Sequence, residues 1–196
     1  MTILRSATDP RWIEAALSDL DATLADHAHC EKKAVATAVK LVADNPERPG
    51  LVRALAKLAQ EELQHFLAMI GEVQRRGKAL APDQGDPYVQ QLLKLVRNGA
   101  PRLVDQLLVF AFVEARSCER MRLLGERLPD ERLRELYRRL AQSEEGHERL
   151  FADLAVEVAV QAGGEPARAG VAARLAELAE AEAAIVAALP LLPRMH

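Results

Sequence analysis

The sequence predicts an all-α protein, a bundle of four long helices with one long crossover and an additional C-terminal helix. Of its 196 residues 49% are apolar but only 4% are aromatic, so the core must be aliphatic. Alanine, leucine, glutamate and arginine dominate, and all four favour helices. The ten prolines and ten glycines fall mainly between long uninterrupted segments. Because the length suits one domain of ordinary size, we expect residues 1–196 to form a single domain.

Proline and glycine set the helix boundaries. The segment NPERPG at 45–50 ends the first helix, and Gly77 ends the second. Pro129 and Asp130 open the fourth helix, and Gly163 with Gly164 ends it. The predicted helices span residues 11–44, 51–76, 101–128, 130–161 and 167–189. We expect the bundle to occupy about residues 11–161 and the last helix, 167–189, to pack against its outside.

The lengths of the links predict the topology. Residues 78–99 carry Pro82, Gly85, Pro87 and Gly99 and form too long a segment for a hairpin turn. We therefore expect a crossover there, with a short helix near residues 88–97. Four helices joined by a short, a long and a short link are typical of the ferritin-like bundle.

Charge and cysteine content exclude several classes. The net charge of −3 argues against a protein that is basic overall and binds nucleic acid by charge alone, although 26 Lys and Arg residues leave room for a local basic face. Two cysteines, Cys30 and Cys118, do not make a disulfide framework and are expected to be free thiols in a reducing compartment. The opening residues MTILRSATDP lack the apolar stretch of a signal peptide, and no apolar run is long enough for a membrane span. We expect a cytoplasmic protein with no membrane partner.

One carboxylate interrupts the apolar stripe of each long helix, where a hydrocarbon side chain is expected. Glu31 does so in the first helix and Glu114 in the third. The second and fourth helices each carry a Glu-x-x-His motif, ELQH at 62–65 and EEGH at 144–147. A separation of three residues places the glutamate and the histidine on one helical face.

A pair of metal ions explains these buried carboxylates. An ionised carboxylate without a partner is costly to bury, and four together would repel one another in a low dielectric. Two divalent ions neutralise them, and two imidazoles complete the ligand set. A glutamate from each of two helices with Glu-x-x-His from each of two others is typical of di-iron and di-manganese carboxylate proteins. The predicted ligands are Glu31, Glu62, His65, Glu114, Glu144 and His147.

An internal repeat supports this pairing. Glu114 follows Glu31 by 83 residues, and Glu144 follows Glu62 by 82, as His147 follows His65. A single Glu-x-x-His motif is weak evidence, because it arises by chance in any glutamate-rich chain. Two of them in this order and register indicate a site with approximate twofold symmetry.

Several neighbours of the ligands receive simpler interpretations. We expect His27 and His29 to be surface residues or to support the ligands from outside, and Tyr137 to be an ordinary core residue. Cys118 packs in the core or lines the cavity, and Arg116 and Arg120 offer local partners for Glu114. The remaining acidic neighbours are expected to be solvated or in salt bridges: Glu61, Glu145 and Glu148.

Four segments around the ligands resemble the MiaE family of tRNA hydroxylases. They are HCEKKA at 29–34, EELQHF at 61–66, EARSCER at 114–120 and SEEGHERLF at 143–151, and the resemblance covers about residues 10–160. EARSCER is the most discriminating of them. The resemblance implies a ferritin-like fold with a non-haem di-iron site. It also implies O₂-dependent hydroxylation of the isopentenyl group of 2-methylthio-N6-isopentenyladenosine, a modified base beside the tRNA anticodon.

The same resemblance implies two iron ions as cofactor, O₂ as co-substrate and tRNA as partner. An external electron donor, a reductase or a ferredoxin, is needed because the sequence carries no flavin or nicotinamide motif. Glu62 and Glu144 would bridge the irons, with Glu31 and Glu114 as terminal ligands. An apolar pocket would be walled by Phe110, Cys118, Phe151 and Leu154. If the arginines gather at one mouth of the bundle, phosphate binding there is expected.

Three other functions remain open at this point. A ferroxidase or iron-storage protein would need a self-assembling shell. A peroxide-handling protein, rubrerythrin-like or manganese-catalase-like, has a similar ligand set, although the Cys-x-x-Cys module typical of rubrerythrins is absent. A structural bundle without activity is disfavoured because all six ligands are present.

Overall fold

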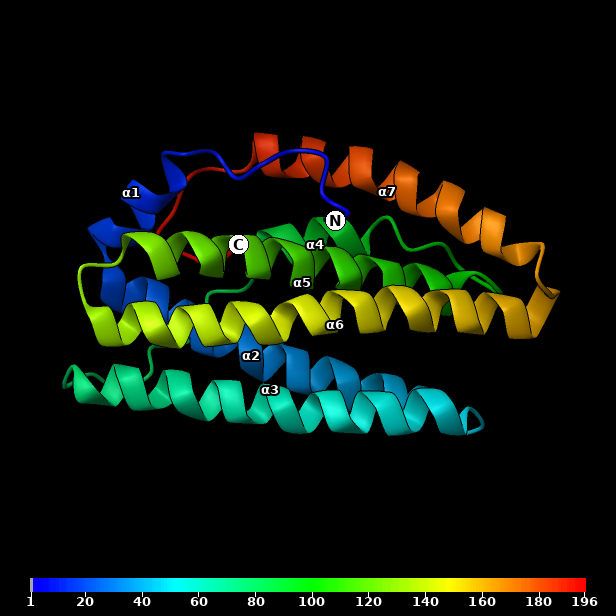
Figure 1. Ribbon diagram of the computed structural model, residues 1–196, viewed down its shortest axis with the longest axis horizontal. Helices are drawn as coiled ribbons and strands as arrows, with labels where there is room; N and C mark the ends of the chain where they lie inside the picture. The colour runs from blue at the N-terminus through cyan, green and yellow to red at the C-terminus, as the bar shows by residue number, and fades with distance from the viewer. Residues whose placement is uncertain (1) are drawn as a thin grey trace. The chain divides into compact units, whose positions relative to one another are not determined.

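The computed structural model describes residues 2–196, and within them it contains seven helices and no strand (Figure 1). The predicted long helices and the short crossover helix are all found, with boundaries within a few residues of those expected except at the start of the chain and at the end of the crossover helix. The helices are α1 Trp12–Ser18, α2 Leu20–Asp44, α3 Pro49–Arg75, α4 Pro87–Leu93, α5 Arg102–Arg127, α6 Glu131–Gly163 and α7 Ala167–Ala188.

The prediction of one continuous helix over residues 11–44 was wrong. Asp19 leaves the helical conformation (φ −141°, ψ 81°), and its carboxylate accepts a hydrogen bond from Ala22 N, so it caps α2. The Thr23 hydroxyl donates to Ala16 O across the break, at 2.8 Å. Aspartate is among the preferred residues at a helix N-cap, because its side chain satisfies an amide that has no partner within the helix. The segment therefore forms two helices, α1 and α2.

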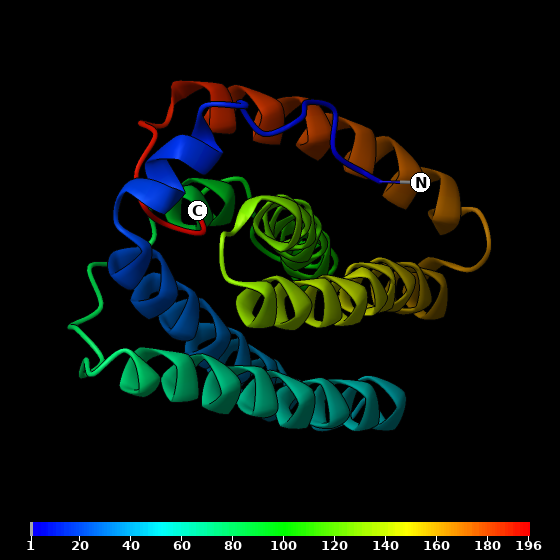
Figure 2. The ribbon, with the colours of Figure 1, turned by 60° about the vertical axis from the view of Figure 1, so that its left-hand side comes forward.

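The chain divides into two compact units. The first, here called the α2–α3 unit, comprises Arg11–Gly85 and Leu191–Met195. Its helices α2 and α3 lie side by side and run in opposite directions (Figure 2). Trp12 Nε1 donates to Arg194 O at 3.0 Å, so the last part of the chain closes over α1.

The second unit, here called the α5–α6 unit, comprises the described residues up to Pro10, Asp86–Pro190 and His196. Here α5 and α6 form the main helix pair, and α7 packs against both of them and against α4. The additional C-terminal helix predicted from the sequence is therefore confirmed. Gly125 allows the close approach of α5 and α6, because a Cβ there would lie 3.3 Å from the backbone nitrogen of Arg138.

A buried ion pair fastens α7 to α5. Arg116 and Glu182 are both 0% exposed, and the guanidinium donates to Glu182 Oε1 at 2.8 and 3.0 Å. The same guanidinium donates to Ser6 O at 3.1 Å, and Tyr88 OH donates to Glu182 Oε1 at 3.0 Å. Arg116, which the sequence offered as a local partner of Glu114, instead joins α5 to α7 and to the N-terminal segment.

Both cysteines are free thiols, as expected. Cys30 on α2 is partly exposed, whereas Cys118 on α5 is buried and donates to Ala141 O at 3.2 Å. Among residues 2–196, none of the helices combines the length and the apolar composition that crossing a membrane requires.

Candidate metal centre

The α2–α3 unit brings three of the six predicted ligands together. Glu31 lies in the middle of α2, and Glu62 and His65 lie one helical turn apart on α3. His65 Nδ1 lies 3.7 Å from Glu31 Oε2 and 3.5 Å from Glu62 Oε2. Both carboxylates are buried, at 4% and 1% exposed. The burial predicted from the apolar stripes of the two helices is therefore confirmed for Glu31 and Glu62.

The α5–α6 unit brings the other three together. Glu114 lies on α5, and Glu144 and His147 lie one turn apart on α6. His147 Nδ1 is 3.1 Å from Glu144 Oε2. All three residues are buried, and each offers a ligand atom within 4.8 Å of those of the other two. Each unit thus holds two carboxylates and one imidazole at close range.

This donor set fits a transition-metal ion. Protein nitrogen and oxygen donors bind such ions at about 2 Å, so donors of one ion lie about 3 to 4 Å apart. The three distances of 3.5, 3.7 and 3.1 Å fall in that range. Imidazole with carboxylate suits iron and manganese, and their positive charge offsets the cost of burying the carboxylates. The joining of the two sets into one centre stays a prediction.

A histidine that the sequence did not assign to the site lies beside Glu31. His27 is 0% exposed, and its Nε2 lies 2.6 Å from Glu31 Oε1. The expectation of a surface position for His27 and His29 was wrong, since both are buried. The alternative expectation, support of a ligand from outside, fits His27. The signal was present as the spacing of four residues from His27 to Glu31, which places both side chains on one helical face.

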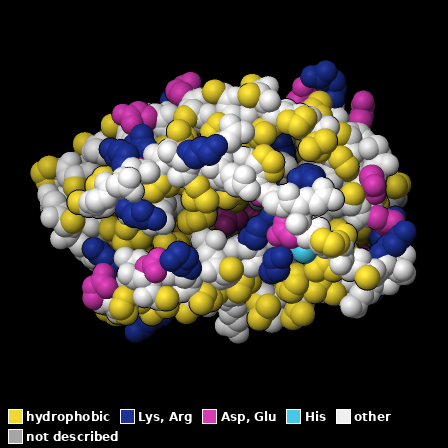
Figure 3. Space-filling model, turned by 180° about the vertical axis from the view of Figure 1, so that it is seen from behind, with side chains coloured by type: hydrophobic (Ala, Val, Ile, Leu, Met, Phe, Trp, Pro, Cys, Tyr) yellow, Lys and Arg dark blue, Asp and Glu magenta, His cyan; other side chains and the backbone are white. Residues whose placement is uncertain are grey.

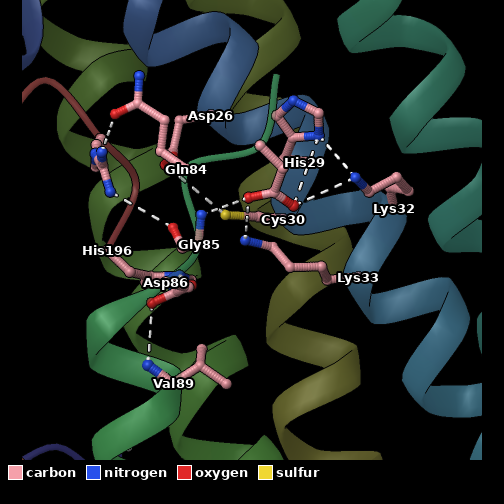
Figure 4. Close-up of polar contacts among 12 residues, drawn as sticks. Asp26, His29, Cys30, Lys32, Lys33, Gln84, Gly85, Asp86, Val89 and His196 are labelled. Carbon is pink, nitrogen blue, oxygen red and sulfur yellow. Dashed lines mark hydrogen bonds and ion pairs between the residues drawn. The ribbon is translucent and has the colours of Figure 1, made fainter. Parts of the chain in front are cut away.

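His29 makes different contacts from those of His27, and Figure 4 shows it beside Lys32. Its Nε2 donates to Ala81 O at 2.6 Å, and its Nδ1 accepts from Lys32 Nζ at 2.9 Å. Lys32 and Lys33 both pair with Asp83. These contacts fasten the start of the crossover to α2, so His29 has a structural role.

Apolar side chains lie on the two helices that carry the predicted ligands of the α5–α6 unit. The rings of Phe110 and Phe151 pack with centroids 5.8 Å apart, and Leu154 and Cys118 are buried on the same helix pair. Burial raises the pKa of the Cys118 thiol to about 11, so the group stays protonated. All four residues expected to wall a pocket therefore lie on the two helices that carry Glu114 and Glu144.

The remaining neighbours behave mostly as expected. Tyr137 is fully buried in the core. Glu61 pairs with Lys57 at 3.7 Å, and Glu145 pairs with Arg122 at 3.0 Å. Burial raises the pKa of Glu148, which is only partly exposed.

Many of the arginines pair with a carboxylate of their own unit. These pairs, which include one lysine, are Arg75 with Glu72, Arg76 and Lys78 with Asp21, Arg97 with Asp105, Arg122 with Glu145, and Arg134 and Arg138 with Glu131. Basic and acidic side chains are interspersed on the face drawn in Figure 3, so charge does not mark an RNA surface on that face. The gathering of arginines at one mouth of the bundle stays a prediction.

Comparison with solved structures confirms the predicted fold class. The chain superposes with a TM-score of 0.90 on protein 43 with aldehyde deformylating oxygenase activity from Synechococcus, a ferritin-like di-iron protein. The match covers 100% of this chain and 96% of the other, at 38% sequence identity. The fold is thus the all-α, ferritin-like one, with α4 in the long crossover and α7 as the additional C-terminal helix.

Sequence comparison places the chain in a family. It is 42% identical over 149 residues to the tRNA 2-(methylsulfanyl)-N(6)-isopentenyladenosine(37) hydroxylase of Pseudomonas putida, covering 76% of this chain and 72% of that protein. The similarly named protein of Salmonella typhimurium is 31% identical over 144 residues, which span 73% of this chain and 50% of that protein. The family model described as tRNA-(MS[2]IO[6]A)-hydroxylase (MiaE) matches residues 1–196. The chain therefore belongs to the MiaE family of tRNA hydroxylases.

Proposed function

We propose that this chain is an O₂-dependent di-iron monooxygenase that hydroxylates the isopentenyl group of 2-methylthio-N6-isopentenyladenosine in tRNA. As a member of a hydroxylase family, the chain is an enzyme. The observation that carries the proposal is the pair of buried donor sets in a chain that matches this family over its whole length. A purely structural bundle would have no reason to bury two carboxylates and an imidazole in each of its helix pairs.

The proposed centre uses all six residues, and residues 1–196 are proposed to form one domain. Glu31, Glu62, Glu114 and Glu144 would supply the carboxylate ligands that hold the two irons. His65 and His147 would each bind one iron. The repeat of 82 or 83 residues supports this arrangement, because it gives each iron an equivalent set of donors.

The iron pair, when bound, would supply the activation of O₂ that an unactivated C–H bond requires. Each turnover would consume one O₂, two electrons and two protons. One oxygen atom would enter the C–H bond as a hydroxyl group, and the other would leave as water. The electrons would come from a separate reductase or ferredoxin.

The chain itself would bind and shield the substrate. Phe110, Phe151 and Leu154 offer an apolar surface for the isopentenyl group and exclude water from the carboxylates. Cys118 adds a neutral, weakly polar wall, since its thiol remains protonated at physiological pH. The proposed setting is the cytoplasm, with the anticodon loop of tRNA as the partner.

Nucleoside mass spectrometry of tRNA from cells with and without this chain tests the proposal. The hydroxylated isopentenyladenosine is expected only with the intact protein, and Glu114→Ala is expected to abolish it. Iron content of the purified proteins is measured in parallel. An unchanged nucleoside profile from a protein that still binds two irons would overturn the tRNA assignment.

The Synechococcus likeness favours one alternative, a di-iron oxygenase that acts on a free aliphatic molecule instead of RNA. That protein has aldehyde deformylating oxygenase activity, and the match covers the whole of this chain. Incubation of the iron-loaded, reduced protein with a long-chain aldehyde separates the two functions. Loss of the aldehyde without any change in tRNA would favour this alternative.

A further inference from the structure

We propose that His27 is a positioning residue that strengthens metal binding through Glu31. The proposal rests on the two-ion site proposed above. It predicts that loss of His27 weakens one of the two metal positions more than the other.

The contact between His27 and Glu31 is short and buried. His27 Nε2 lies 2.6 Å from Glu31 Oε1, and the two side chains are 0% and 4% exposed. An ionised carboxylate can only accept hydrogen bonds, so the imidazole N–H donates. A hydrogen bond to a charged acceptor in a dry environment is among the stronger ones in proteins.

This hydrogen bond occupies one oxygen of Glu31 and leaves the other directed at a second ligand. Glu31 Oε2 lies 3.7 Å from His65 Nδ1, on the opposite helix of the unit. With Oε1 held by His27, the carboxylate cannot rotate without breaking the bond. Glu31 is therefore held ready to bind a metal ion through Oε2, together with His65.

The sequence repeat shows what occupies the equivalent position in the other half. Glu114 follows Glu31 by 83 residues, and the residue 83 positions after His27 is Phe110. A phenyl ring has no N–H to donate, and that of Phe110 packs against Phe151 with centroids 5.8 Å apart. The position four residues before the terminal glutamate thus holds a hydrogen-bond donor in one half and an apolar wall in the other.

Titration of the metal-free protein with Co²⁺ under anaerobic conditions tests the proposal. Removal of hydrogen bonds to metal ligands typically costs 10–100-fold in affinity. We expect His27→Leu to weaken one of the two Co²⁺ steps by about 10–100-fold and to leave the other within about twofold. His27→Gln, whose amide can donate to Glu31, should recover most of the loss.

A matched control lies two residues away. His29→Leu removes an equally buried histidine of the same helix that contacts Ala81 and Lys32 instead of a ligand. Both Co²⁺ steps should keep their wild-type affinity in this variant. Thermal melting of the metal-free proteins separates a loss of folding from a loss of metal binding. If His27→Leu does not fold, His27→Phe, which introduces the ring found at Phe110 and has no N–H to donate, replaces it in the test.

A double-mutant cycle shows whether His27 acts through Glu31. In a Glu31→Ala background, the change at His27 should have no further effect on Co²⁺ binding. In a Glu114→Ala background, the full effect should remain. The proposal is overturned if folded His27→Leu binds both ions as the wild type does, if both steps weaken equally, or if the effect persists without Glu31.

The cycle is independent of the hydroxylation assay. Coupling between His27 and Glu31 in a protein that never modifies tRNA would leave the inference standing and remove the proposed function. Hydroxylation of tRNA by a protein without coupling between His27 and Glu31 would leave the proposed function standing and remove the inference about His27.

Discussion

The helix pairs α2–α3 and α5–α6 carry the same ligand pattern in different surroundings. Both pairs bury a glutamate on one helix and a Glu-x-x-His motif on the other. In the α2–α3 unit the short buried contact of His27 is made to a ligand, Glu31. In the α5–α6 unit a buried ion pair between Arg116 and Glu182 fastens α5 to α7.

This difference teaches that a repeat can preserve its ligands while the residues around them diverge. The proposed ligands would be retained because a metal pair has the same requirements in both halves. The surrounding residues differ because they have different roles. His27 contacts a carboxylate in one half, whereas Arg116 attaches an additional helix in the other. The comparison predicts that the two units respond differently to equally buried changes.

The largest expected effect on stability is in the α5–α6 unit. Arg116→Leu leaves Glu182 charged and buried without its main partner, and breaking a buried ion pair in this way costs about 3–5 kcal/mol. The double replacement Arg116→Leu with Glu182→Leu should cost much less, because no charge is left behind. Urea unfolding followed by circular dichroism measures both.

The matched change in the other unit is His27→Leu, which should reduce the stability of the metal-free protein far less than Arg116→Leu does. Equal losses in the single and double Arg116 variants would contradict the role given to the ion pair. Equal losses in Arg116→Leu and His27→Leu would remove the contrast between the units.

An intermediate effect is expected at Asp105, a second buried carboxylate of the α5–α6 unit. Its carboxylate accepts from Arg97 Nε at 2.8 Å and from Arg174 NH2 at 3.1 Å. Burial acts to raise the pKa of Asp105, but these hydrogen bonds outweigh it and leave the pKa below its usual value. The resulting stability is therefore fully present above the usual aspartate range and is lost as pH falls through the lowered pKa.

Asp105→Asn should accordingly cost about 1–3 kcal/mol at neutral pH. Its disadvantage relative to the wild type should shrink in acid, because the wild-type carboxylate is then protonated. The free energy of unfolding measured from pH 7 down to pH 3 checks both points. A difference that stays constant over this range would show that the charge of Asp105 contributes nothing.

The smallest effect concerns the cysteines, one in each unit. Because burial raises the pKa of Cys118 to about 11, only roughly a thousandth of it is thiolate at pH 8. Cys30 is partly exposed on α2, so iodoacetamide should modify it first in the folded protein. Intact mass and peptide mapping over time follow the reaction, with denatured protein as the reference in which both react. Equal rates in the folded protein would show that α5 opens readily.

Much of the fold and all six candidate ligands could be predicted from the sequence, because they depend on local signals. Proline and glycine end helices wherever they occur, and a carboxylate in an apolar stripe stands out against its neighbours. The Asp19 break could not be seen in this way, since an aspartate fits a helical pattern and a helix cap equally well. Glu182 gave no signal either, because its burial depends on Arg116, 66 residues away in the sequence.

The sequence left two positions open for His27, on the surface or beside a ligand, for a related reason. A histidine at a helical spacing from a glutamate occurs on surfaces as well as in cores, and only packing decides between them. The carboxylate partners of some arginines could not be predicted from the sequence either, because pairs such as Arg174 with Asp105 join different helices. Local patterns thus predicted which carboxylates and histidines come together in each helix pair, whereas the contacts around them required the folded structure.

The discontinuity of the α2–α3 unit has a consequence for synthesis of the protein on the ribosome. Its helices emerge early, yet Arg194 O accepts from Trp12 across 182 residues and Met195 N donates to Asp26 across 169. The α2–α3 hairpin can form from neighbouring contacts as it emerges, but its final closure must wait until Arg194 and Met195 have been translated. This helix pair is therefore begun before α5 and α6 are made and is completed after them.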